Sequence, residues 1–119
     1  MALVEAVPAG IYGKAALDSL GLWEDVADNV AQTDNVRAAL ALVATGEAPY
    51  GLVYASDAVA DDSVTVVGTF PADSHPPIIY PVADITGRDT PAEADFMDFL
   101  RSPDARKAFE RQGFTVLDR

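Results

Sequence analysis

The sequence predicts an α/β fold. Segments rich in β-branched or alternating apolar residues stand between stretches with helical apolar spacing, which begin at Pro, Asn or Thr and end at Gly. Strands that alternate with helices in this way are typical of α/β proteins. Apolar residues make up 50% of the 119 residues and no low-complexity run is present, so the chain can bury one folded core.

The N-terminal part is predicted to be a strand followed by a helix. Residues 2–6 form the strand, and Pro8 suits the first turn of the helix because its missing N–H would have no partner there. Ile11 and Leu20 lie on the apolar side of this helix. Gly21 follows as the residue that closes it.

The next helix is the best defined of the chain. A short irregular or helical segment at residues 22–30 precedes it, and residues 33–35 (Thr-Asp-Asn) offer alternative N-caps. Residues 36–43 are dense in Ala and Leu, and Gly46 ends the helix.

Two strands are predicted after this helix, at residues 51–55 and 64–70, the second rich in β-branched side chains. The segment 71–77 (Pro-Ala-Asp-Ser-His-Pro-Pro) is the strong breaker cluster of the chain. We therefore expect a boundary there, followed by a further strand at residues 78–85.

The C-terminal part is predicted to hold two helices and a strand. Thr90 opens the first helix with a capping-box pattern, and its apolar face of Phe96, Met97, Phe99 and Leu100 is expected to pack on a sheet. Ser102 and Pro103 open the second helix and Gly113 closes it, before a terminal strand at residues 114–117.

Charge and composition exclude several classes of function. The net charge of −11 argues against nucleic acid and anionic membrane surfaces, but not against an anion in a buried site, because salt screens surface charge over about 8–10 Å. The absence of cysteine excludes disulfides and, with a single His, disfavours zinc. No apolar stretch approaches the roughly 20 residues of a membrane span, and we expect no secretory signal within these residues.

Three short stretches point to a binding site. Residues 7–12 (VPAGIY) and 34–40 (DNVRAAL) are loop-to-helix junctions, where backbone N–H groups have no partner within the helix. Residues 51–58 (GLVYASDA) are predicted to deliver the hydroxyl of Tyr54 at the end of a strand. These are neutral donors, which suit a small oxyanion.

These stretches occur in an order that resembles the periplasmic molybdate-binding proteins of bacterial ABC uptake systems. The resemblance runs from about Val7 to the C-terminus. It rests on residues 7–12, 35–43, 46–49, 53–58, 70–75 and 113–116.

The resemblance covers only the C-terminal half of such proteins, which close two lobes on their ligand. It implies a type II periplasmic-binding-protein-like α/β fold, truncated to most of the second lobe plus the C-terminal segment of the first. Residues 1–70 would be the oxyanion-binding region of the second lobe, residues 71–77 the hinge or crossover, and residues 78–119 the segment that completes the first lobe.

The resemblance also implies the site and the function. Ala9 and Val36 would donate backbone N–H groups to the oxyanion, and Tyr54 its hydroxyl. The implied function is the binding of molybdate or tungstate as part of the periplasmic solute receptor of an ABC transporter, whose permease would be the partner. No catalysis, no cofactor and no resident metal are expected.

Two alternatives remain open. The chain could be a self-associating α/β fragment with no ligand function, forming a homodimer in which residues 76–119 are exchanged or not. An enzyme such as a hydrolase is disfavoured because the sequence offers no nucleophile–base pair.

Two further groups of polar residues have structural interpretations. Asp73, Ser74 and His75 are neighbours in sequence, which rarely form a catalytic triad, so we interpret His75 as a turn residue. Asp57, Asp61 and Asp62 match no calcium-loop spacing and are expected in a solvated loop.

Overall fold

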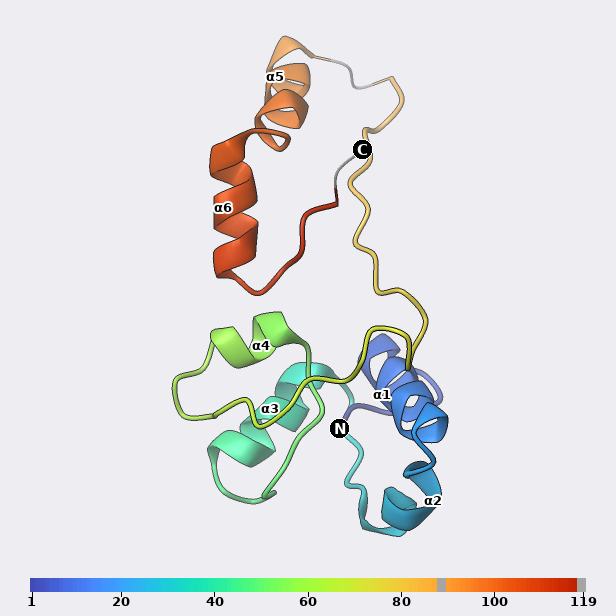
Figure 1. The fold of residues 1–119 in the computed structure, drawn as a ribbon. Helices are drawn as coiled ribbons and strands as arrows, with labels where there is room; N and C mark the ends of the chain where they lie inside the picture. The colour runs from blue at the N-terminus through green and yellow to red at the C-terminus, as the bar shows by residue number, and fades with distance from the viewer. Residues whose placement is uncertain (88–89, 118–119) are drawn as a thin grey trace. The chain divides into compact units, whose positions relative to one another are not determined.

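The computed structural model describes residues 1–87 and 90–117, and the chain folds as two compact units, Met1–Pro77 and Ile78–Arg119. No helix within the described ranges has the length and apolar character needed to cross a membrane. The first unit contains α1 (Pro8–Ser19), α2 (Trp23–Val26), a 3-10 turn (Ala27–Asn29), α3 (Val36–Ala44) and α4 (Ala55–Val59); the second contains α5 (Pro91–Phe99) and α6 (Pro103–Arg111) (Figure 1).

The predicted helix boundaries are confirmed by the local geometry. Pro8 is the first residue of α1, and the side chain of Asn35 caps α3 by accepting a hydrogen bond from the amide of Ala38 at 2.9 Å. Gly21 and Gly46 follow α1 and α3 with φ of 69° and 78°, a left-handed conformation that glycine adopts without steric cost. Local sequence signals are sufficient for these helix ends because the capping contacts span only a few residues.

The predicted strands are wrong for the described residues. Residues 2–6, 51–55, 64–70, 78–85 and 114–117 are loops or turns, except that Ala55 begins α4, and a single isolated parallel bridge joins Ala2 to Thr33. β-branched composition favours a pleated surface but supplies no neighbouring strand for the N–H and C=O groups. The α/β class is therefore not confirmed by the structure itself.

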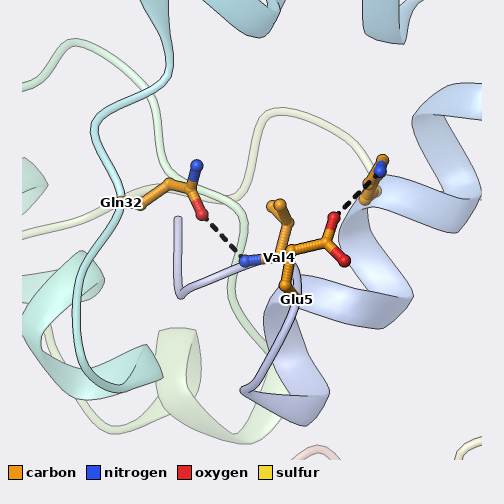
Figure 2. Close-up of polar contacts among 4 residues, drawn as sticks. Val4, Glu5 and Gln32 are labelled. Atoms are coloured by element: carbon orange, nitrogen blue, oxygen red, sulfur yellow. Dashed lines mark hydrogen bonds and ion pairs between the residues drawn. The ribbon is translucent and has the colours of Figure 1, made fainter.

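The core of the first unit forms where residues 1–4 pass the start of α1. Ala2 is fully buried, and the bridge to Thr33 is closed by hydrogen bonds from the Leu3 amide to the Thr33 carbonyl (2.9 Å) and from the Thr33 amide to the Met1 carbonyl (3.0 Å). The amide of Val4 donates to Oε1 of Gln32 at 2.9 Å, and Glu5 pairs with Lys14 of α1 at 3.2 Å (Figure 2).

Two glycines set the spacing between elements of this unit. A Cβ on Gly10 of α1 would lie 2.2 Å from the carbonyl oxygen of Leu3, so only glycine allows α1 to approach the N-terminal segment this closely. A Cβ on Gly51 would lie 2.8 Å from Cγ2 of Val43 in α3. Leu52, the next residue, contacts α1 near Gly13. The segment that leads to Tyr54 is thus packed against both α1 and α3.

The second unit is organised around aromatic side chains. Phe114 makes edge-to-face contacts with Tyr80 (5.6 Å between ring centroids) and with Phe109 of α6 (6.3 Å). The predicted packing of the α5 face on a sheet is wrong for this unit. Phe96 and Phe99 are 56% and 54% exposed, since the described residues contain no sheet for them to cover.

Candidate functional site

The three predicted site residues all belong to the first unit, each at the start of a helix. Ala9 is the second residue of α1, Val36 is the first residue of α3, and Tyr54 directly precedes α4. The prediction that Tyr54 ends a strand is wrong, because Tyr54 lies at the N-cap of a short helix.

The start of α1 is left without a side-chain cap. Val7 precedes the helix in extended conformation and makes no capping hydrogen bond, and the first turn contains no acidic residue. Ala9 and Gly10 are both buried there. Their N–H groups belong to the first turn, where a helix offers no acceptor, so this end of α1 carries partial positive charge without a compensating side chain.

The start of α3 is capped on one amide only. Asn35 satisfies the amide of Ala38, which is the third helical position. Val36 and Arg37 occupy the first two positions, whose N–H groups have no acceptor within the helix. The side chain of Asn35 therefore leaves the first amides of α3 for another acceptor.

Hydrogen bonds connect the starts of α1 and α3. Val7 donates its amide to the carbonyl of Leu3 at 3.0 Å, and Leu3 donates to Thr33 through the bridge described above. The hydroxyl of Thr33 then donates to the carbonyl of Asn35, the N-cap of α3, at 2.8 Å. The two donor-bearing helix ends are thus held by one continuous hydrogen-bonded path.

The predicted solvated loop is wrong for Asp57. Asp57 lies in α4 with only 4% of its surface exposed. Its Oδ2 accepts a hydrogen bond from the Tyr54 amide at 3.2 Å, and its own amide donates to the Tyr54 carbonyl at 3.0 Å. The three-residue spacing from Tyr54 to Asp57 is the spacing of an N-cap and its third helical residue, which is the signal that could have found it.

An ion pair connects the starts of α3 and α4. Nε of Arg37 lies 2.7 Å from Oδ1 of Asp57. Arg37 follows Val36 and is the basic residue nearest in sequence to the three predicted contacts. Because Asp57 compensates the guanidinium charge, the donors around Val36 and Tyr54 are neutral in net charge.

The remaining polar candidates have other partners. The Ser74 hydroxyl donates to the Pro71 carbonyl at 2.6 Å, and Nδ1 of His75 lies 2.9 Å from the Pro76 carbonyl oxygen. The His75 ring also lies against Tyr12 of α1, so both side chains have structural partners. Ser63 hydrogen-bonds to Asp61 and lowers the pKa of that carboxyl. Within the described ranges, no group of three or more His, Asp or Glu side chains is placed to hold a metal ion.

A shallow hollow in the first unit lies apart from the predicted site. Its volume is about 350 Å³, and its lining includes Glu5 and Lys14 but not Ala9, Val36 or Tyr54. None of the three predicted contacts lines this hollow; Ala9 is buried, and Val36 and Tyr54 are partly exposed.

Two bacterial molybdate-binding proteins match more than nine-tenths of this chain. The molybdate-binding protein ModA of Escherichia coli is 50% identical over 94% of this chain, and that of Haemophilus influenzae is 47% identical over 92%. The matched segments are 44% and 43% of those two proteins, so this chain spans less than half the length of the curated relatives that it matches.

A solved structure and a family model agree with these matches. A substrate-binding domain assigned to a molybdenum ABC transporter of Clostridium difficile superposes with a TM-score of 0.86 at 35% identity, covering 98% of this chain and 52% of that one. The family model described as bacterial extracellular solute-binding protein matches residues 1–115. The chain therefore belongs to the bacterial extracellular solute-binding protein family.

Proposed function

We propose that this chain supplies part of the binding site of a bacterial receptor for molybdate or tungstate. The observation that carries the proposal is the 50% identity to the E. coli molybdate-binding protein over 94% of the chain. The relative from H. influenzae, which has the same function in its name, supports the same ligand class.

The geometry of the first unit supports an oxyanion ligand. The starts of α1 and α3 carry amides at Ala9 and Val36 that lie in first helical turns, where anions are stabilised by the unpaired N–H groups and the helix dipole. Tyr54 adds a hydroxyl from the start of α4. The nearest guanidinium, that of Arg37, is paired with Asp57, so the anion would be held by neutral donors.

The finer architecture is also part of the proposal. The chain would be the C-terminal half of a two-lobed type II binding protein, with residues 1–70 in the second lobe, residues 71–77 as the crossover and residues 78–119 completing the first lobe. The receptor would act outside the cytoplasmic membrane, deliver its anion to an ABC permease and perform no catalysis. The names of the relatives and of the family support the extracellular location and the ABC transporter partner.

A hybrid protein tests this proposal. Residues 1–115 of this chain would replace the matching segment of the E. coli relative, and calorimetry would measure the affinity for molybdate, with sulfate as the competing anion. We expect the hybrid to bind molybdate. Tyr54→Phe should weaken binding by about 1.5–3 kcal/mol, because it removes one hydrogen bond to a charged ligand.

Tyr50→Phe is the matched control, since Tyr50 lies four residues earlier and is 73% exposed. Its substitution should leave the affinity unchanged. A hybrid that folds but does not bind molybdate would refute the proposed function. Equal affinities for the Tyr54→Phe and Tyr50→Phe variants would remove Tyr54 from the site.

The chain by itself should bind the anion weakly. Under this proposal the opposite lobe supplies around half of the donors and closes the ligand off from water. The loss of several hydrogen bonds at about 1.5 kcal/mol each lowers the affinity by at least 10³-fold. Sub-micromolar binding of molybdate by the monomeric 119-residue chain would contradict this expectation.

A further inference from the structure

Asp57 differs from the other ion-paired carboxylates of the described residues. Its side chain is 5% exposed, whereas the paired side chains of Glu5, Asp98 and Asp104 are more than four-fifths exposed and that of Glu110 is half exposed. A carboxylate held away from water is stable only when its oxygens are satisfied. Both oxygens of Asp57 have partners, one on α3 and one at the start of α4.

These two partners lie next to the two proposed ligand contacts of this region. Oδ1 pairs with Arg37, the neighbour of Val36, while Oδ2 accepts from the backbone amide of Tyr54 itself. One carboxylate therefore connects the first turn of α3 to the residue that carries the proposed ligand hydroxyl.

α4 needs such a connection because it is short. It has five residues, and a helix of one to two turns is not stable by itself in water. Its orientation must come from contacts with its surroundings. The Arg37–Asp57 pair, with 2.7 Å between nitrogen and oxygen, is a directional contact between α4 and α3.

We propose that Asp57 is a positioning residue of the oxyanion site. It holds the start of α4 on the start of α3, so that the Tyr54 hydroxyl and the Val36 amide keep a fixed relation before the anion binds. In the same contact it keeps the Arg37 guanidinium away from the anion, so that the ligand meets neutral donors. This inference rests on the proposed function.

The variant Asp57→Asn separates positioning from simple electrostatics. It removes a negative charge and releases a cation beside the site, so charge alone would make anions bind more tightly. If Asp57 positions Tyr54, the same variant should instead bind anions more weakly. Calorimetry on the hybrid with the E. coli relative gives the molybdate affinity, and amide hydrogen exchange of the ¹⁵N-labelled 119-residue chain reports on Tyr54.

We expect Asp57→Asn and Arg37→Gln each to weaken molybdate binding about tenfold or more and to speed exchange of the Tyr54 amide. Exchange of Ala16, inside α1, should stay unchanged. The matched controls are Asp98→Asn and Arg101→Gln, which break an exposed pair of the second unit with the same changes of charge. They should alter neither quantity.

Three results would decide the matter differently. Tighter binding by Asp57→Asn would overturn the proposal, and so would an equal rise of exchange at Ala16, which would mean that the residue only stabilises the unit. If Tyr54 exchange rises as expected but the folded hybrid binds no molybdate even without a substitution, the positioning of Tyr54 is supported and the proposed oxyanion function fails.

Discussion

The two units of the chain differ in how many of their own side chains they bury. In Met1–Pro77, eight apolar residues from the N-terminal segment, α1 and α3 are buried, and the polar side chains of Asp57 and Ser74 are buried with hydrogen-bond partners. In the described part of Ile78–Arg119, Ala105 is the residue that is buried. Large apolar side chains there, such as Ile79, Val82 and Ile85, are more than half exposed.

This difference shows that apolar composition and a self-contained core are separate properties. Both units are rich in apolar residues and both leave large ones exposed, such as Val67 in the first, but only the first brings several elements close enough to bury a common set. Half of its eight buried apolar residues are alanine, and Gly10 lets α1 approach the backbone of Leu3. The proposed site residues lie in the unit whose elements hold one another in place, as a preorganised site requires.

The largest expected effect is that of Gly10→Ala. The added methyl group would lie 2.2 Å from the Leu3 carbonyl oxygen, and backbone cannot move aside as a side chain can. We expect the first unit to lose about 3 kcal/mol or more of unfolding free energy, measured by urea denaturation. Gly68→Ala is the control, since a Cβ there meets no atom within 4 Å. Equal midpoints for the two variants would show that the approach of α1 to residues 1–4 is not tight.

The next effect compares a buried apolar side chain of the first unit with an exposed one of the second. Leu40 of α3 is 5% exposed and Phe99 of α5 is 54% exposed. Leu40→Ala should cost about 2–4 kcal/mol of unfolding free energy, and Phe99→Ala less than about 1 kcal/mol, because only the first opens a cavity. A larger loss for Phe99→Ala would mean that α5 is covered in solution, and would remove the contrast between the units.

A third prediction concerns the exposed apolar side chains of the second unit. We expect the chain to associate with itself, because a surface carrying Ile79, Val82 and Ile85 gains free energy when it is covered. Light scattering at micromolar concentration should give a mass above that of one 12.6 kDa chain. The double variant Val82→Lys, Ile85→Lys should lower that mass. A wild-type mass equal to that of one chain at all concentrations would contradict the prediction.

The smallest effects are those of pH. A hydrogen bond to Asp84 raises the pKa of Glu93 above its usual 4.5, whereas hydrogen bonds from Ser63 lower the pKa of Asp61 below 3.8. By protonation linkage, the two groups then change the free energy of unfolding in opposite directions as the pH rises. The stabilising contribution of Glu93 to the folded state is complete below about pH 4.5 and is lost as the pH rises through its raised pKa. The stabilising contribution of Asp61 is complete above about pH 3.8 and is lost as the pH falls through its lowered pKa.

Carboxyl ¹³C NMR titration checks both directions in one sample. The variant Ser63→Ala should return the pKa of Asp61 toward its ordinary value while leaving Glu93 unaffected, since the two groups belong to different units. A pKa of Glu93 at or below 4.5 would show that it does not share a proton with Asp84 in solution.

Several features of this chain could be read from the sequence because their physical causes are local. Pro8 and Asn35 begin helices and Gly21 and Gly46 end them through contacts that span a few residues, so sequence alone determined α1 and α3. Ala9, Val36 and Tyr54 were selected by the same junction patterns together with the family resemblance, and their role as ligand contacts stays a prediction.

Tertiary structure alone decided the rest, since it depends on partners distant in sequence. Whether residues 64–70 or 78–85 form strands depends on a neighbouring strand, and the described residues supply none. Asp57 looked like one of three solvated carboxylates, yet it is buried because Arg37, twenty residues earlier, and the backbone of Tyr54 satisfy both of its oxygens. Spacing in sequence shows the local conformational preference of each residue. Its burial and its pairing depend on other residues that only the fold brings close.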